Sequence, residues 1–398
     1  MKQYSLEKAC VKITDGSHFS PKDTGNGYPM LSVKDMDEYG FNRTACKYIS
    51  YEDFEKLKKQ DCVPRKNDIL VAKDGSYLKH IFICEEDREE GILSSIAIFR
   101  PNTAIVEPRY LMYLLKSPQV FNDVKNNYVS GSALPRIVLK DFKKVRFNIP
   151  SLAQQNKVVE ILSPIDRKIR LNQQINNNLA EQAQGVLYHF MDKYLYQLKP
   201  LSDLAVVIDC LHSKKPSAKD DGTYQLIQLD NIRDDGFLDM SARKYMISKS
   251  DYENWTRKCE IVEGDCVITN VGRIGAVSQA PYGTKAAMGR NMTCIRLKSG
   301  LQLQSYFITV LLSKHMRRQV QSNTDEGTIM GALNVKNIPK LLFPVFDDSV
   351  MSELESILFP LRKQIEYNNL QNQNLTQTRD ILLPKLMSGE IDVSDIQL

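Results

Sequence analysis

Two long stretches of the chain place apolar residues three or four positions apart, which is the pattern of an amphipathic helix. The first covers residues 151–190 and the second covers residues 349–386. Pro164 and Pro360 interrupt the two stretches at matching places. Because proline lacks the N–H that a helical hydrogen bond needs, each helix is predicted to kink or break there. The sequence therefore predicts two long helices of similar length.

Beyond each proline the apolar residues follow a heptad seam, with alternating steps of four and three residues. Two helices with one apolar stripe each most simply bury those stripes against each other, and the long segments between them allow an antiparallel pair. Asparagine recurs at the same two levels of both seams, where an amide costs stability unless it is paired, but fixes the register. The residues predicted to hold the register are Asn172, Asn176, Asn368 and Asn372. The alternative, that these faces are solvated, stays open.

Short alternating runs of apolar residues precede each long helix and predict β-strands. Residues 67–86 contain two such runs around an Asp-Gly-Ser turn, and residues 264–278 repeat the arrangement with Gly272 at the turn. Further strands and then helices are predicted at 93–99 and 108–116 in the first segment and at 291–297 and 304–314 in the second. The expected fold class is therefore α+β, with two mixed α/β segments separated by two long antiparallel helices that form a coiled coil.

The chain matches itself when it is shifted by about half its length. An offset of 196 residues aligns Tyr110 with Tyr306. Small insertions change the offset elsewhere, so that His18 aligns with His212. Such matches extend over the full half, which predicts a tandem duplication and an internal pseudo-two-fold repeat. The predicted boundaries are 1–150 and 198–346 for the mixed segments and 151–197 and 347–398 for the helices.

The composition is that of an ordinary folded protein. Of 398 residues 42% are hydrophobic and 25% are charged, and 53 Lys and Arg against 48 Asp and Glu give a net charge of +5. This excess is compatible with nucleic-acid binding but too small to establish it alone. No run approaches the roughly 18 apolar residues of a membrane span, and the N-terminus lacks a secretory signal. We therefore expect a cytoplasmic protein without a membrane partner, with its eight cysteines reduced.

Two similar but unequal modules suit a ligand that repeats along its length. Double-stranded DNA is such a ligand, and two different readers would recognise two different half-sites, giving an asymmetric split target. Lys and Arg contact phosphates, and Arg, Asn and Gln also read base edges. Positions near hairpin turns and glycine-rich loops are favoured over positions in helices. The DNA-binding candidates are His18, Arg43, Lys47, Lys73, Ser76, Lys79, Arg136, His212, Lys214, Lys215, Arg243, Lys244, Asn270, Arg273, Arg290 and Asn291. For each, the alternative is a solvated surface side chain.

The sequence lacks the motifs of the enzyme classes that act on DNA. It has no Pro-Pro pair for an amino-methyltransferase motif and no glycine-rich nucleotide or phosphate loop. No two cysteines have CxxC spacing, and the five histidines do not pair at metal-ligand spacing. Asp166 is predicted to lie on a solvated helix face. We therefore predict no catalytic residue and no metal in this chain, and the alternative function is a protein-interaction scaffold with duplicated modules.

Both helix starts and the C-terminus carry a family resemblance. In residues 145–162, VRFNIPSLAQQNKVVEIL, a predicted strand is followed by a proline and then by a helix, with Ser151 and Gln154 as a capping box. Residues 340–358, KLLFPVFDDSVMSELESIL, repeat this order of strand, proline and helix. LLPKLMSGEI at 382–391 is similar to the family's closing segment. The chain resembles the specificity (S) subunit of type I restriction-modification enzymes, the HsdS family. The second copy departs from the family pattern because it lacks a Glu-Gln pair at the helix start.

The resemblance implies a role that the residues alone do not give. The two mixed segments would be target recognition domains, each reading one half of a bipartite DNA site. The helices would set the gap between the half-sites and dock two methyltransferase (M) subunits, and restriction (R) subunits would join them. The chain itself would bind no cofactor, because S-adenosylmethionine, ATP and Mg are expected on the partner subunits.

Overall fold

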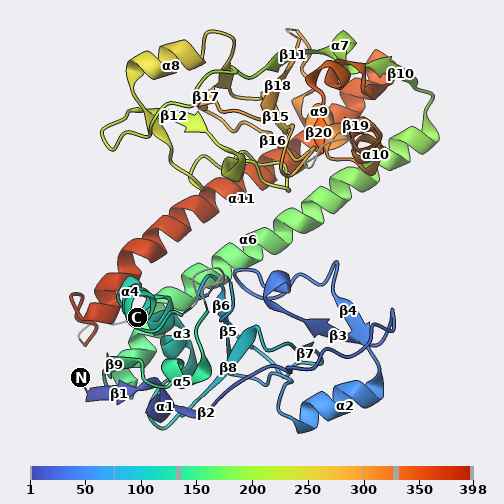
Figure 1. The fold of residues 1–398 in the computed structure, drawn as a ribbon. Helices are drawn as coiled ribbons and strands as arrows, with labels where there is room; N and C mark the ends of the chain where they lie inside the picture. Colours follow the sequence, from blue (N-terminus) through green and yellow to red (C-terminus); the bar gives the residue numbers. More distant parts are fainter. Residues whose placement is uncertain (1, 76, 131–135, 299, 326–330, 395–398) are drawn as a thin grey trace. The chain divides into compact units, whose positions relative to one another are not determined.

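The computed structural model describes residues 2–75, 77–130, 136–298, 300–325 and 331–394 (Figure 1). The chain divides into two compact units, the first holding residues 1–170 with 375–398 and the second holding residues 171–374. Each unit contains one mixed α/β segment together with parts of both long helices. The predicted α+β class is therefore confirmed.

The first unit is built around three antiparallel or mixed sheets. Its strands are β1 (Lys2–Ser5), β2 (Cys10–Asp15), β3 (Tyr28–Leu31), β4 (Lys47–Ile49), β5 (Ile69–Ala72), β6 (Ile81–Ile83), β7 (Gly91–Ile92), β8 (Ile96–Pro101) and β9 (Arg146–Ile149). Its shorter helices are α1 (Leu6–Ala9), α2 (Tyr51–Lys59), α3 (Pro108–Lys116), α4 (Pro118–Asn127) and α5 (Leu139–Phe142). The strand orders are β2-β8-β5-β6, β4-β3-β7 and β1-β9.

The predicted first hairpin is confirmed. β5 pairs antiparallel with β6, with Ile69 opposite Ile83, and Gly75 in the connection has a φ of +70°. All four residues of β5 are buried because the strand has a core on each face. Ile69 and Val71 pack in the cluster that includes α3, whereas the residues between and after them pack in a second cluster on the other face. A strand that is covered on both faces therefore has an uninterrupted run of apolar residues in its sequence.

The second unit repeats this architecture. Its strands are β10 (Gln197–Pro200), β11 (Ala205–Asp209), β12 (Tyr224–Ile227), β13 (Met246–Ile247), β14 (Glu260–Val262), β15 (Cys266–Thr269), β16 (Val277–Gln279), β17 (Lys285–Met288), β18 (Met292–Leu297), β19 (Thr324–Asp325), β20 (Ala332–Leu333) and β21 (Leu342–Val345). Its shorter helices are α7 (Leu201–Leu204), α8 (Lys249–Trp255), α9 (Gln304–Leu311) and α10 (Lys314–Ser322). The order β11-β18-β15-β16 matches β2-β8-β5-β6 strand for strand.

One ion pair with a buried carboxylate holds the same place in both copies. Arg100 on β8 donates from Nε to Asp68 Oδ1 at 2.8 Å, and Arg296 on β18 donates from Nε to Asp265 Oδ1 at 2.7 Å. Asp68 is fully buried and Asp265 is 2% exposed. A buried carboxylate needs such a partner, because an unpaired one is costly. Sheet order and ion pair together confirm the internal repeat.

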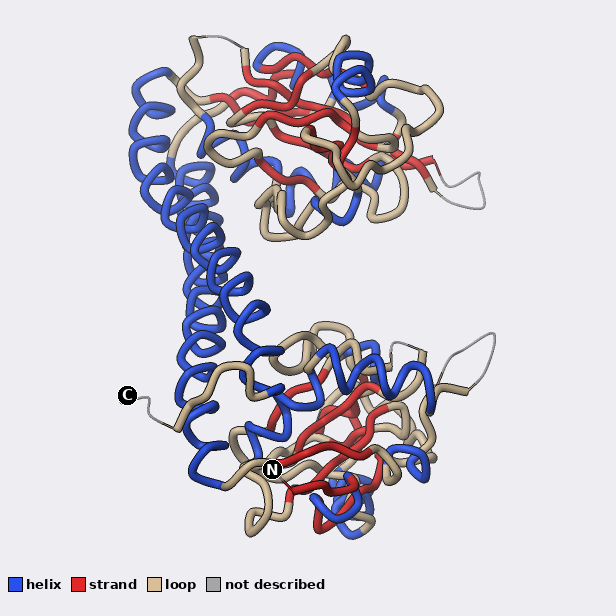
Figure 2. The backbone as a smooth tube through the Cα atoms, turned by 90° about the vertical axis from the view of Figure 1, so that its left-hand side faces the viewer, coloured by secondary structure: helices blue, strands red, loops and turns tan. Residues whose placement is uncertain are grey.

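The long helices are α6 (Leu152–Lys193) and α11 (Asp348–Ser388), and within each unit they pack side by side in opposite directions (Figure 1; Figure 2 draws the helices in blue). The capping box is present, since Ser151 N donates to Gln154 Oε1 at 3.3 Å and Gln154 N donates to Ser151 Oγ at 3.4 Å. Of the two outcomes predicted at the prolines, a break is wrong, whereas a kink stays a prediction. Pro164 lies inside α6 and Pro360 inside α11, and both are solvent-exposed. Water can therefore hydrogen-bond the carbonyl that each proline leaves without a donor.

In the second unit the asparagines of the seam are buried and hydrogen-bonded across the helix pair. Asn172 Nδ2 donates to Asn372 Oδ1 at 2.8 Å, and Asn368 Nδ2 donates to Asn176 Oδ1 at 2.8 Å. All four side chains are at most 7% exposed. The alternative of a solvated face is therefore wrong for these residues. Their role in fixing the register stays a prediction.

Replacement of Asn172, Asn176, Asn368 and Asn372 by leucine is expected to increase the free energy of unfolding by about 1–3 kcal/mol, because apolar side chains replace buried amides. The same change should loosen the register, which disulfide trapping between cysteines placed along α6 and α11 would measure. Leucine at the exposed Asn177 and Asn178 is the matched control. A quadruple variant that unfolds, or that keeps a single trapping pattern, would contradict this role.

Candidate nucleic-acid interface

One edge of each four-stranded sheet gathers the loops that carry many of the candidate residues. β2 and β5 both run antiparallel to β8, so both end where β8 begins, and β11, β15 and β18 meet in the same way. The connections after these strands are here named the edge loops: residues 16–27 and 73–80 in the first unit, and 210–223 and 270–276 in the second. Strand direction therefore brings together residues that are far apart in the sequence.

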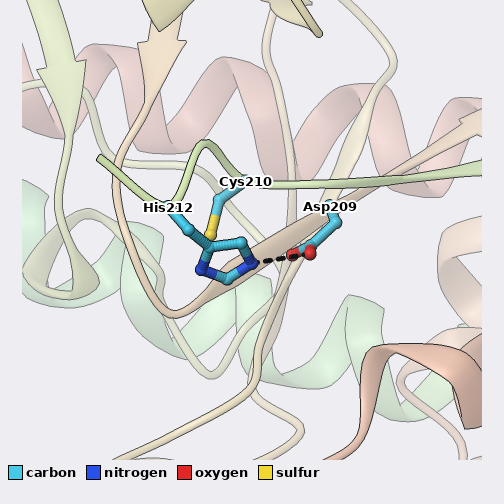
Figure 3. A group of neighbouring side chains, drawn as sticks. All are labelled: Asp209, Cys210 and His212. Carbon is cyan, nitrogen blue, oxygen red and sulfur yellow. Dashed lines mark hydrogen bonds and ion pairs between the residues drawn. The ribbon is translucent and has the colours of Figure 1, made fainter.

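An aspartate at the end of the strand orients a histidine in each copy. His18 Nε2 lies 3.5 Å from Asp15 Oδ2, and His212 Nε2 lies 2.7 Å from Asp209 Oδ2 (Figure 3). The two histidine side chains are 80% and 68% exposed. The matched histidines were predicted from the sequence, whereas the aspartates were not. The Asp-x-x-His spacing, present in both copies, was the signal that could have found them.

Cys210 lies beside the Asp209–His212 pair, and the three side chains together offer atoms of the kinds that bind metal ions. The ligand atoms of Asp209, Cys210 and His212 all lie within 4.8 Å of one another (Figure 3). Oxygen, sulfur and imidazole nitrogen are the ligands that zinc accepts. Burial raises the pKa of the Cys210 thiol, which opposes formation of the thiolate. The first copy has Gly16 at the position of the cysteine. The predicted absence of a metal stays a prediction.

A second group with metal-ligand atoms is already occupied by an arginine. Cys259, Asp265 and Cys294 are buried together, with their ligand atoms within 4.8 Å of one another. Arg296 donates to both carboxylate oxygens of Asp265. A cation in this group would compete with that guanidinium, so the geometry favours a structural role.

Lys73 and Asn270 hold matching positions at the start of an edge loop, and both are buried. Lys73 Nζ lies 3.4 Å from Asp15 Oδ2 and 3.3 Å from Asp74 Oδ2. Asn270 donates from Nδ2 to the Leu333 carbonyl at 3.2 Å and accepts at Oδ1 from Thr293 Oγ1 at 3.0 Å. Both side chains are therefore engaged within the protein, whereas the sequence predicted that they would be free to contact DNA. Lys73 and Asn270 support the edge loops from within.

Most other candidates are exposed. In the edge loops these are His18, Lys79, His212, Lys214 and Arg273, and beside the edge loops or elsewhere they are Arg43, Arg136, Arg243, Lys244, Arg290 and Asn291. Lys215 is half-buried, with Nζ 4.0 Å from the ring centroid of Tyr245, and Lys47 is half-buried and donates to the Pro21 carbonyl. Ser76 lies outside the described residues.

Two of the exposed candidates contact an edge loop through the backbone. Arg136 forms a β-bridge with Asp74, and the carbonyl of Asn291 accepts from Asn270 N at 2.8 Å. The left-handed φ of +64° at Asn291 turns the chain at the start of β18. Arg136 and Asn291 therefore add a basic and an amide side chain to the exposed surface beside the edge loops.

Three exposed arginines are held by carboxylates. Arg43 pairs with Glu90 at 2.9 Å, Arg243 with Asp230 at 2.8 Å and Arg273 with Asp234 at 2.9 Å. In the pairs of Arg243 and Arg273 both side chains are exposed, and such pairs contribute about 0–1 kcal/mol, so a phosphate or a base can replace the carboxylate at small cost. Glu90 is buried, so the ion pair of Arg43 is costlier to break. Lys79, Arg136, Lys214, Lys244 and Arg290 form no ion pair with any described residue.

Comparison with known proteins supports the resemblance found in the sequence. Residues 11–181 match the family model of the type I restriction modification DNA specificity domain. The chain is 21% identical to the type I restriction enzyme HindI specificity subunit of Haemophilus influenzae, over 98% of this chain and 99% of that protein. The chain is therefore similar to type I restriction-modification specificity subunits over nearly its whole length. It is also 23% identical to the MjaVIII specificity subunit of Methanocaldococcus jannaschii, over 93% of this chain and 87% of that protein.

The fold agrees with that family. The crystal structure of the type I restriction-modification system S subunit from M. genitalium aligns with a TM-score of 0.53 and 14% identity, over 97% of this chain and 96% of that chain. The fold that the resemblance implies is therefore confirmed. Within the described part of the chain, no helix combines the length and apolar character that a membrane crossing requires.

Proposed function

We propose that this specificity subunit binds double-stranded DNA without catalysing a reaction, and that each unit reads one half of a bipartite, asymmetric target. The matched edge loops carry this proposal. In both copies an Asp–His pair and a buried residue at the loop start fix the framework, whereas the exposed side chains between them differ. A common framework with unlike reading residues suits two unlike half-sites.

The exposed candidates divide into two kinds of DNA contact. Lys79, Arg136, Lys214 and Lys244 are cations without a described ion-pair partner, and they suit phosphates. Arg273, Arg290 and Asn291 carry groups that can make paired hydrogen bonds to guanine or adenine. Because Lys73 and Asn270 are satisfied inside the protein, we assign them to loop support. The matched His18 and His212 suit phosphate contacts, held in place by their aspartates.

The partners proposed here follow from the family. Two methyltransferase (M) subunits would dock on α6 and α11, and restriction (R) subunits would complete the system. S-adenosylmethionine, ATP and Mg would be bound by those partners. We further propose that the lengths of α6 and α11 set the unspecified gap between the half-sites. The competing proposal, a protein-interaction scaffold, assigns no role to the basic edge loops.

Salt dependence separates the two proposals. The complex of this chain with its methyltransferase partner should lose DNA affinity steeply as salt rises, because bound phosphates release counterions. Replacing Lys79 or Arg136 by alanine should reduce the slope of log K against log salt by about 1 each. Fluorescence anisotropy with labelled duplex DNA measures this. Lys59→Ala on α2, outside the edge loops, is the control, and an equal slope in all variants would favour the scaffold.

A further inference from the structure

Arg362 on α11 is a buried cation without an ion-pair partner among the described residues. Its side chain is 9% exposed, and its Nε atom is buried with no hydrogen-bond acceptor. Burial lowers the pKa of the guanidinium below its usual value, since the charged form loses hydration. A buried charge that lacks a partner costs several kcal/mol, so each such group calls for an explanation.

The first unit shows what the second unit lacks. There Asp166 on α6 lies 3.1 Å from Arg379 on α11, and this ion pair is buried. The repeat offset of 196 residues carries Asp166 onto Arg362 and Ala183 onto Arg379. The second unit therefore has an arginine and an alanine where the first has a carboxylate and an arginine. Duplication has left a guanidinium without its counter-ion.

The carboxylates that face Arg362 are already engaged. The negative charges of Asp235 and Glu366 both act to raise the pKa of the Arg362 guanidinium, although neither forms a direct contact with it. However, Arg233 Nη2 donates to Asp235 Oδ2 at 2.7 Å, and Lys363 Nζ lies 2.9 Å from Glu366 Oε2. Neither acid is within ion-pair distance of Arg362. The guanidinium is thus free to bind an additional anionic group.

Arg362 also lines a cavity within the second unit. The cavity measures about 490 Å³, which is larger than a single oxoanion and within the range of small-molecule sites. Phe237, Phe359 and Ile365 give it apolar surface, and Phe359 is 51% exposed although it is aromatic. Gly236 adjoins the guanidinium, and a Cβ there would lie 2.6 Å from Leu312 Cδ1 and 3.0 Å from Arg362 Nη2, so a larger residue would crowd both side chains.

We propose that this cavity binds an organic carboxylate. The planar guanidinium of Arg362 takes the carboxylate group, a geometry that permits two parallel hydrogen bonds. Phe237 and Phe359 contact the apolar body of the ligand. A free organic acid and an acidic side chain of a partner subunit carry the same chemistry, and the two are separated by experiment.

The test uses the full chain and sodium benzoate as the probe, with sodium chloride at equal ionic strength as the reference. Benzoate is expected to raise the melting temperature of the wild type in a saturable manner. Arg362→Met should weaken benzoate binding by about ten- to a hundredfold, since it removes charged hydrogen bonds. Lys363→Met is the matched control, because that lysine lines the same cavity but is paired with Glu366. Arg362→Met should melt no lower than the wild type in chloride.

The second arm measures binding of the methyltransferase partner to the wild type and Arg362→Met. A benzoate effect with unchanged partner binding identifies a free acid as the source. Partner binding that is lost only in Arg362→Met identifies an acidic side chain of the partner. The proposal is overturned if benzoate stabilises the wild type and Arg362→Met equally. It is also overturned if benzoate has no effect and Arg362→Met binds the partner normally, or if Arg362→Met melts far below the wild type in chloride.

Discussion

Exchange of residues 1–150 for the corresponding segment of another specificity subunit is expected to change one half of the DNA target and leave the other half unchanged. This segment closes on itself, because β1 pairs with β9 from Lys2–Ile149 to Ser5–Arg146. The strands of its sheets all come from the same segment. Its edge loops therefore keep their geometry when the segment is moved as a whole. Sequencing of methylated DNA from a host that carries the chimera measures the outcome.

The reciprocal exchange of residues 198–346 is the matched experiment. Here β10 pairs with β21 from Gln197–Val345 to Pro200–Leu342, so the second segment is closed in the same way. This chimera should change the half-site that the first chimera preserves. If either exchange altered both half-sites, the proposal that each unit reads its own half-site would be wrong.

Replacement of Arg379 by methionine is expected to destabilise the protein by about 3–5 kcal/mol, because it leaves the largely buried carboxylate of Asp166 without its cation. Arg379 Nη1 lies 3.1 Å from Asp166 Oδ1, 2.9 Å from Glu38 Oε1 and 3.0 Å from Tyr39 Oη. The side chains of Arg379 and Asp166 are each 13% exposed, so water cannot replace the lost donor fully. Urea denaturation of the full chain measures the change.

The matched control for Arg379→Met is Arg362→Met, which removes the arginine that has no ion pair. The two residues lie on the same helix and are both largely buried. If the ion pair is the cause, only Arg379→Met should be strongly destabilising. Equal losses in the two variants would show that the packing of the arginine stem, and not the charge, carries the effect.

The elements that the sequence predicted correctly depend on local patterns. The hairpin of β5 and β6 follows from alternation around a glycine turn, and α3 was predicted at the residues where it occurs, Pro108–Lys116. The seam asparagines were found because the heptad spacing is periodic over many turns. The break predicted at Pro164 failed for a physical reason, since the exposed side of a helix tolerates the lost hydrogen bond.

The parts that the sequence did not predict depend on partners that are distant in the chain. Asp166 was expected on a solvated face, but Arg379 binds it, and 213 residues separate the two. Lys73 was expected to be free for DNA, but it lies between Asp74 and Asp15 at the end of another strand. The spacing of residues along the sequence does not predict ion pairs between residues that are far apart in the chain. Only the strand order shows which charges are left exposed.

The central claim is that two unlike units of one chain read the two halves of one split DNA site. Its most direct test is to map DNA methylation in the host with and without this gene. The account predicts that deletion removes one methylated motif made of two different specified parts separated by unspecified bases. Unchanged methylation, or loss of a single uninterrupted motif, would contradict it.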